Sequence, residues 1–192
     1  MARRNSRMLS LGTPAPQFKL CDTASGRTVA LEDFAASPAL LVAFVCNHCP
    51  FVKHILDGFV AYARDFGPRG LATVAISSND ATAYPDDAPA AMSRVAAAKG
   101  FSFPYLYDES QEVAKAYQAV CTPDFFLFGR DRRLAYRGQF DGSRPGNNIP
   151  VTGSDLRAAT DAVLLGRGVP AEQAPSVGCS IKWKAGRAPD WA

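Results

Sequence analysis

Two apolar runs of strand length stand out in the first half of the chain, at residues 40–45 and 71–77. Neither run alternates with polar positions, and such continuous runs are typical of strands that are buried on both faces of a sheet. Between them, apolar side chains recur at spacings of three and four over residues 54–66. This period predicts an amphipathic helix that ends at Gly67.

The rest of the pattern alternates short strands with helices. The predicted strands lie at residues 18–20, 27–30, 104–107, 125–128 and 134–137. The predicted helices are a single turn at 31–34 and longer helices over 85–99, 111–117 and 154–165. Strands that alternate with helices predict parallel pairing with crossovers, whereas the two hairpins add antiparallel strands. The sequence therefore predicts a three-layer α/β fold, with a mixed central sheet, helices on both faces and an N-terminal hairpin extension.

We expect one domain with two short extensions. Residues 12–168 hold all of the predicted elements and form the domain. Residues 1–11 are predicted to be a flexible N-terminus. Residues 169–192 are rich in proline, so we expect a tail that packs on the domain without further regular structure.

The composition is that of a globular protein of ordinary size. The 192 residues are 47% hydrophobic and 20% charged, and the net charge is +3. Because the basic residues are dispersed, we expect no nucleic-acid partner. No apolar run approaches the roughly 20 residues that span a bilayer, so we expect no membrane association. The segment after Arg3-Arg4 lacks the apolar stretch of a signal peptide, which favours a cytoplasmic location.

The candidate chemistry is concentrated in Cys46-Asn47-His48-Cys49-Pro50, directly after the first buried strand. Two cysteines separated by two residues can switch between a dithiol and a disulfide, and the N-terminus of a following helix favours the thiolate. The chain has five cysteines, and an odd number favours catalysis or metal binding over a disulfide scaffold in a reducing compartment. We predict that Cys46, at the helix start, is the nucleophile and that Cys49 resolves the mixed disulfide.

The residues beside the two cysteines are predicted to tune them. A protonated His48 would stabilise a neighbouring thiolate and make the disulfide less reducing than that of thioredoxin, whose potential is about −270 mV. The alternative is that His48 is a solvated residue that touches neither sulfur. Pro50 lacks an N–H and conflicts with a helix that begins at Cys46. Either the helix begins later, or its first turn is distorted.

A second motif, Cys121-Thr122-Pro123, precedes the predicted strand at 125–128. A proline is tolerated at the first residue of a strand. A cis peptide bond before Pro123 would present the backbone of Thr122 as an edge on which a substrate peptide docks. Cys121 and Cys179 are candidate auxiliary thiols, with burial in the core as the alternative for each.

Five segments of the chain together carry a family resemblance. They are residues 15–20 (Ala-Pro-Gln-Phe-Lys-Leu), 44–51 (Phe-Val-Cys-Asn-His-Cys-Pro-Phe), 107–111 (Tyr-Asp-Glu-Ser-Gln), 121–124 (Cys-Thr-Pro-Asp) and 178–183 (Gly-Cys-Ser-Ile-Lys-Trp). In combination they resemble the thioredoxin superfamily, and within it a bacterial subgroup of redoxin or AhpC/TSA-like proteins. The resemblance implies a thioredoxin-like fold, a cis Pro123 beside the cysteine pair and thiol–disulfide exchange. Thioredoxins also use a buried acid for proton transfer, for which Glu32 and Asp33 are candidates.

Three functions are compatible with these features. The first is thiol–disulfide exchange with a protein or small-molecule disulfide, using a reducing partner such as a thioredoxin or glutathione system and no cofactor. The second is a thiol peroxidase of the AhpC/TSA type. Two features of such enzymes are missing. Ala43 stands three residues before Cys46, where they have Thr or Ser, and the residues just before the strand at 125–128 include no arginine to polarise a peroxide. The third is a copper-binding module on Cys46, Cys49 and one further ligand, which the two-residue spacing disfavours, so no metal is predicted at the pair.

Overall fold

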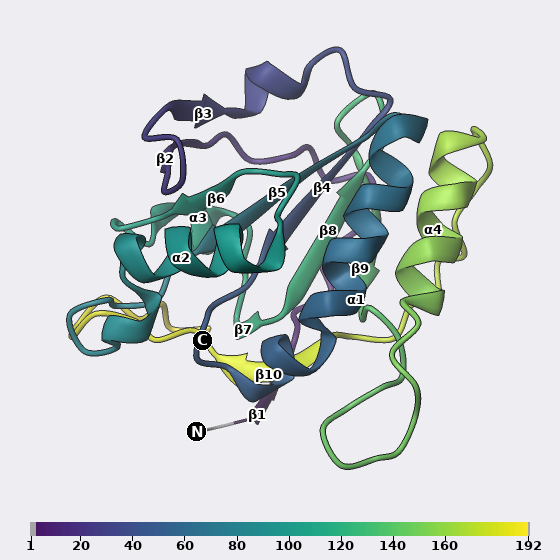
Figure 1. Cartoon of the computed structure of the whole chain (residues 1–192). Coiled ribbons are helices and arrows are strands. Elements are labelled where there is room, and N and C mark those ends of the chain that lie inside the picture. Colours follow the sequence, from purple (N-terminus) through teal and green to yellow (C-terminus); the bar gives the residue numbers. More distant parts are fainter. Residues whose placement is uncertain (1–2, 192) are drawn as a thin grey trace.

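The computed structural model describes residues 3–191, and its centre is a seven-stranded mixed sheet (Figure 1). In sheet order, the strands are β3 (Thr28–Ala30), β2 (Lys19–Asp22), β6 (Tyr105–Tyr107), β5 (Leu71–Ser77), β4 (Ala39–Phe44), β8 (Asp124–Phe128) and β9 (Leu134–Gly138). The pairs β4–β5 and β5–β6 are parallel, and all other neighbours are antiparallel. The predicted mixed sheet is therefore confirmed.

Helices cover both faces of this sheet, which completes the three predicted layers. On one face lie α1 (Pro50–Phe66), α2 (Pro89–Lys99) and α4 (Ser154–Leu164), and on the other lies α3 (Glu112–Ala116) (Figure 1). Three short 3-10 helices, η1 (Leu31–Phe34), η2 (Gly67–Arg69) and η3 (Pro85–Asp87), occupy connections. Within residues 3–191, no helix combines the length and the apolar character needed to cross a bilayer.

Strand β4 is the middle of the core and leads directly into the cysteine motif. All six of its residues are fully buried. Leu41 and Ala43 pack towards α1, whereas Leu40 and Val42 pack on the opposite side with α3. The alternation follows from the strand period of two, and burial on both faces explains why the sequence shows an unbroken apolar run.

A second, three-stranded sheet forms where the sequence predicted a flexible N-terminus and a C-terminal tail without regular structure. Both of these predictions are wrong. The N-terminus contributes β1 (Arg3–Asn5), and the C-terminal tail contributes β10 (Val177–Ser180). Strand β10 pairs antiparallel with β1 on one side and with β7 (Cys121–Thr122) on the other. Residues 177–180 follow Pro175 and contain no proline. Their backbone N–H groups are therefore available to pair with the open edge of β7. Residues 1, 2 and 192 lie outside the described part of the extensions.

The tail packs very closely on the strand that it covers. A Cβ atom at Gly178 would lie 2.0 Å from the carbonyl oxygen of Thr122, so only glycine fits at this position. Beyond β10, the amide of Gln111 donates to the carbonyl of Lys182, and its oxygen accepts from the backbone N–H of Lys184. The tail is therefore held both by strand pairing and by buried side-chain hydrogen bonds.

Replacement of Gly178 by alanine tests this packing. We expect Gly178→Ala to lower the free energy of unfolding by about 1–3 kcal/mol, the usual cost of an added methyl group in a packed region. Chemical denaturation followed by circular dichroism measures the change. Gly168→Ala is the matched control, because a Cβ there meets nothing within 4 Å. Equal stability of Gly178→Ala and the wild type would contradict the close approach.

Candidate active site

The cysteine motif lies between the end of β4 and the start of α1, and its second cysteine caps the helix. Cys49 is the N-cap residue in an extended conformation, and Pro50 is the first helical residue. A proline is well suited to that position, where its missing N–H has no helical partner to lose. The helix thus begins at the last residue of the motif, and its first turn is regular, with the Lys53 N–H bonded to the Cys49 carbonyl. The prediction that Cys46 stands at the helix start is wrong, because Pro50 sets the start one residue after Cys49.

The two predicted motifs meet in space. The Sγ atom of Cys46 lies 3.3 Å from the Thr122 hydroxyl, and the Sγ atom of Cys49 lies 3.1 Å from the Thr122 carbonyl oxygen. The peptide bond between Thr122 and Pro123 is cis, as the resemblance implies. Both cysteines are almost completely enclosed, with exposed fractions of 2% for Cys46 and 0% for Cys49.

The two thiols share hydrogen bonds, and Cys49 ionises first. The pKa of Cys49 is lowered to about 5, mainly because the Cys46 thiol donates to its sulfur, with further donors at the Cys179 thiol and the backbone N–H of Val52. The start of a 17-residue helix adds partial positive charge at the same atom. One contact opposes ionisation, because the Thr122 carbonyl beside Cys49 accepts a hydrogen bond only from the protonated thiol. Burial of Cys49 also raises its pKa, but the donors outweigh both opposing influences, so we assign the first thiolate to Cys49.

Cys46 remains a thiol for the complementary reasons. Its pKa is raised well above the usual value because it donates to Cys49, because it is buried, and because the carboxylate of Asp87 is close. The Thr122 hydroxyl acts in the opposite direction but is the weaker influence. The pair therefore consists of a thiolate at Cys49 and a proton-bearing neighbour at Cys46, which is the pattern that thiol–disulfide exchange requires.

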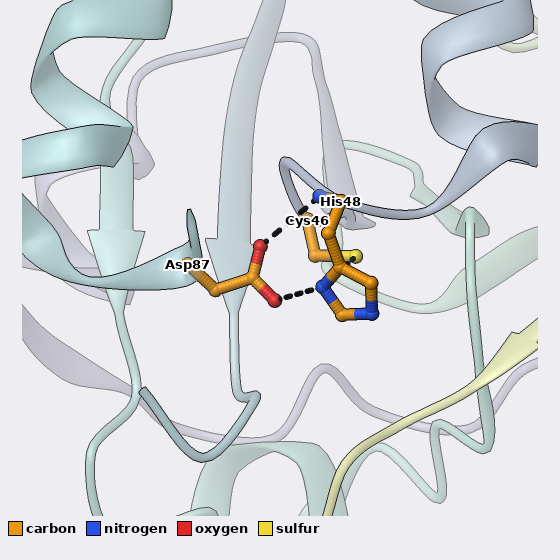
Figure 2. A group of neighbouring side chains, drawn as sticks. All are labelled: Cys46, His48 and Asp87. Carbon is orange, nitrogen blue, oxygen red and sulfur yellow. Dashed lines mark hydrogen bonds and ion pairs between the residues drawn. The ribbon is translucent and has the colours of Figure 1, made fainter. Parts of the chain in front are cut away.

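Asp87 organises the loop that carries the pair, and Figure 2 shows its contacts with the backbone N–H and the ring of His48. This buried carboxylate accepts from the backbone N–H groups of Asn47, at 2.7 Å, and His48, at 3.3 Å. It also lies 2.5 Å from the Nδ1 atom of His48 and accepts from the side-chain amide of Asn79 at 2.7 Å. Sequence reasoning missed Asp87, although the carboxyl ends of the parallel strands β4 and β5 meet at one sheet edge and so bring their following segments together.

His48 is a structured neighbour of Cys46 with one ring nitrogen already engaged. Its Nδ1 atom is 3.9 Å from the Cys46 sulfur, and its ring stacks on Tyr84 at a centroid distance of 5.1 Å. A carboxylate only accepts hydrogen bonds, so Nδ1 carries a hydrogen that it donates to Asp87. Only 11% of the His48 side chain is exposed, so the solvated alternative does not apply. His48 is thus held in a defined position beside Cys46.

The donor atoms of Cys46, His48 and Asp87 lie within 4.8 Å of one another, which raises the question of a metal ion. The separation of 2.5 Å between His48 Nδ1 and Asp87 Oδ2 is a hydrogen-bond distance. Two tetrahedral ligands at metal–ligand distances near 2.1 Å would stand about 3.3 Å apart. The arrangement fits a hydrogen bond that positions a histidine better than a metal centre.

The predicted docking edge is already occupied by the chain itself. Strand β10 pairs with β7 so that Cys179 stands opposite Thr122, and Ser180 stands opposite Cys121. Side chains alternate along a strand, so Cys179 shares the face of Thr122 and of the cysteine pair, whereas Cys121 lies on the other face. The Cys121 sulfur instead contacts the Pro123 carbonyl at 3.6 Å. Of the two candidate auxiliary thiols, the structure brings only Cys179 to the pair.

The buried acids differ from those suggested by the sequence. Glu32 and Asp33 are exposed on η1, where Asp33 accepts from a backbone N–H. Besides Asp87, several other aspartates are buried, and one of them, Asp124, begins β8, where burial raises its pKa to about 7. The buried guanidinium of Arg137 lies 3.5 Å from Asp124 and over the ring of Phe126. Sequence reasoning missed this arginine because it comes from β9, beyond the motif.

Comparison with known proteins places this geometry in a family context. The model of the AhpC/TSA family matches residues 11–137. A solved structure of an uncharacterised conserved protein from Geobacillus kaustophilus is 55% identical, covers 96% of this chain and 98% of that chain, and superimposes with a TM-score of 0.94. No curated protein matches the chain.

More distant solved structures share the fold. Peroxidoxin BcpB from Mycobacterium tuberculosis is 17% identical, with 81% of this chain and 99% of that chain covered and a TM-score of 0.61. A thiol:disulfide interchange protein of the thioredoxin family from Chlorobium tepidum is 16% identical, with 82% and 99% covered and a TM-score of 0.62. At these identities the likeness concerns the fold alone, and it confirms the thioredoxin-like architecture.

The ionisation order can be read from thiolate absorbance at 240 nm. In the reduced wild type, we expect about one thiolate to appear with a midpoint near pH 5, because the lowered pKa belongs to Cys49. Cys46→Ala removes the main donor and should move this midpoint upward, whereas Cys121→Ser should leave it unchanged. A first thiolate that appears only above pH 8, near the ordinary cysteine value of about 8.5, would contradict the assignment.

Proposed function

Because this chain belongs to the AhpC/TSA family of thioredoxin-fold redox proteins, we propose that it is a thiol–disulfide oxidoreductase with Cys46 and Cys49 as its redox pair. The observation that carries the proposal is the enclosure of both thiols at the start of α1, where the neighbouring Cys46 thiol lowers the pKa of Cys49. Their contacts with Thr122, next to the cis Pro123, support the same reaction. The odd number of cysteines and the dithiol chemistry suit a reducing compartment, and we propose the cytoplasm.

The reaction begins at the thiolate of Cys49. This sulfur attacks one sulfur of a substrate disulfide, and the other substrate sulfur leaves as a thiolate that takes up a proton. Cys46 then loses its proton and attacks Cys49, which forms the Cys46–Cys49 disulfide and releases the second substrate thiol. The substrate disulfide is reduced by two electrons, and the protein dithiol is oxidised by two. A reducing partner, such as a thioredoxin or glutathione system, restores the dithiol.

The neighbours of the pair contribute position and charge. The hydrogen bond to Cys49, burial and the charge of Asp87 together keep Cys46 protonated, so we propose Cys49 as the nucleophile, which reverses the sequence-based order of nucleophile and resolving cysteine. Pro50 begins the helix directly after Cys49. The partial positive charge at the helix N-terminus therefore acts on the Cys49 sulfur. A low thiolate pKa stabilises the reduced form, so we propose a disulfide less reducing than that of thioredoxin.

A thiol peroxidase is the second candidate function, and the enclosure of the pair favours it. A peroxide is small enough to reach sulfur atoms that are 0–2% exposed more readily than a protein disulfide. The Thr or Ser that such enzymes place three residues before the reactive cysteine is missing, however. Ala43 and Cys46 occupy the positions three residues before the two cysteines. Arg137 is paired with Asp124 and lies over the ring of Phe126, which belongs to the core cluster on the other side of the sheet from the cysteine pair.

The two candidates are separated by turnover assays on the full-length protein. With dithiothreitol as electron donor, we expect Cys46→Ser and Cys49→Ser each to lower the rate of insulin-disulfide reduction at least tenfold, because both sulfur atoms are needed for release of product. Insulin turbidity measures this rate. Cys21→Ser is the matched control, since Cys21 is an exposed thiol on β2, outside the pair.

An unchanged rate in Cys49→Ser would contradict thiol–disulfide exchange at this pair. Hydrogen peroxide consumption is measured with the same variants. We expect it to proceed no faster than with free cysteine. A rate at least a hundredfold above free cysteine, lost in Cys49→Ser, would establish the peroxidase as the main activity instead.

A further inference from the structure

The edge beside the redox pair holds a strand of the protein itself. In an extended docking mode, a substrate strand would pair with the backbone of β7. Strand β10 takes that place, with Cys179 opposite Thr122 in antiparallel register. The missing side chain of Gly178 allows the two backbones to approach, since a Cβ there would lie 2.0 Å from the Thr122 carbonyl. The tail is thus placed as a bound peptide would be (Figure 1).

This internal strand presents a sulfur atom to the pair. Cys179 is 3% exposed and lies on the face of β10 that Thr122 shares across the strand pair. The Thr122 carbonyl is also 3.1 Å from the Cys49 sulfur, so Cys49 and Cys179 approach the same residue from two elements. Cys46, Cys49 and Cys179 also belong to the same buried cluster of the core, and the Cys179 thiol helps to lower the pKa of Cys49. Three sulfur atoms therefore form one contiguous group around Cys49.

We propose that Cys179 is a third redox thiol, which exchanges with the Cys46–Cys49 disulfide to form a Cys49–Cys179 bond that fastens β10 across the cis Pro123 edge. In this step, Cys179 loses its proton and its sulfur attacks Cys49. The bond between Cys46 and Cys49 breaks, and Cys46 leaves as a thiolate that takes up that proton. One disulfide is exchanged for another, so the step needs neither an oxidant nor a reductant.

The two disulfide isomers differ in whether a substrate can reach the backbone edge of Thr122. The Cys46–Cys49 disulfide leaves β10 held by non-covalent contacts alone, so the edge of Thr122 can become available when the strand separates. The Cys49–Cys179 disulfide ties β10 to α1 and keeps the edge closed, while Cys46 is returned to its thiol form. The tail then acts as an internal substrate that limits access to the pair. This inference rests on the proposed function, because it starts from the Cys46–Cys49 disulfide.

Disulfide mapping of the full-length protein tests the proposal. Reduced protein is oxidised with a small excess of oxidised glutathione, quenched with acid and alkylating agent, and digested for mass spectrometry. In the wild type we expect both the Cys46–Cys49 and the Cys49–Cys179 linkages. Cys46→Ser should raise the Cys49–Cys179 share at least tenfold, because the competing thiol is absent. Cys121→Ser is the matched control and should leave the distribution unchanged, since Cys121 lies on the other face.

Amide hydrogen exchange supplies the structural readout. In oxidised Cys46→Ser, exchange of residues 177–180 should slow at least tenfold relative to the same variant after reduction. Cys46→Ser protein that carries only glutathione on Cys49, without the Cys49–Cys179 linkage, would overturn the proposal. If the variant fails to fold, wild-type mapping decides: a Cys46–Cys49 linkage without any Cys49–Cys179 linkage refutes this inference alone. Absence of the Cys46–Cys49 linkage from the wild type would instead refute the proposed function.

Discussion

The packing of Gly178 against the carbonyl of Thr122 determines how the cysteine pair is enclosed. A side chain at residue 178 would separate two backbones that are otherwise in contact, because its Cβ would stand 2.0 Å from that oxygen. The contact lets β10 pair with β7, and β1 then pairs with β10. As a result, both chain ends join one sheet beside the pair, and β10 places Cys179 in the same buried cluster as Cys49. The reactive sulfur atoms are shielded by the strand that competes with substrate.

A single buried carboxylate complements this enclosure. Asp87 holds the loop between β4 and α1 through the backbone N–H groups of Asn47 and His48. Its negative charge disfavours a thiolate at Cys46, whereas the donors at the helix start favour one at Cys49. The group that holds the loop in place thus also adds to the preference for a thiolate at Cys49. Geometry and reactivity at the site are set together.

Local patterns were sufficient for much of the fold. The continuous apolar run that forms β4 and the three-and-four spacing that forms α1 reflect burial within each element, which single-segment reasoning can recognise. The meeting of Cys46 with Thr122 was predicted through the family resemblance. In contrast, the role of Asp87 depends on which strand ends become neighbours in the sheet. Strand β10 forms because β7 offers it an edge, and no period within the tail encodes that partner.

The central claim is that Cys46 and Cys49 exchange between a dithiol and a disulfide, and a redox titration tests it most directly. The full-length protein is equilibrated in glutathione buffers of graded potential, and the Cys46–Cys49 linkage is quantified by mass spectrometry after acid quenching. The account predicts one two-electron transition with a midpoint less reducing than thioredoxin's value of about −270 mV. Cysteines that stay unlinked to each other at every potential, reduced or each joined to glutathione, would contradict it.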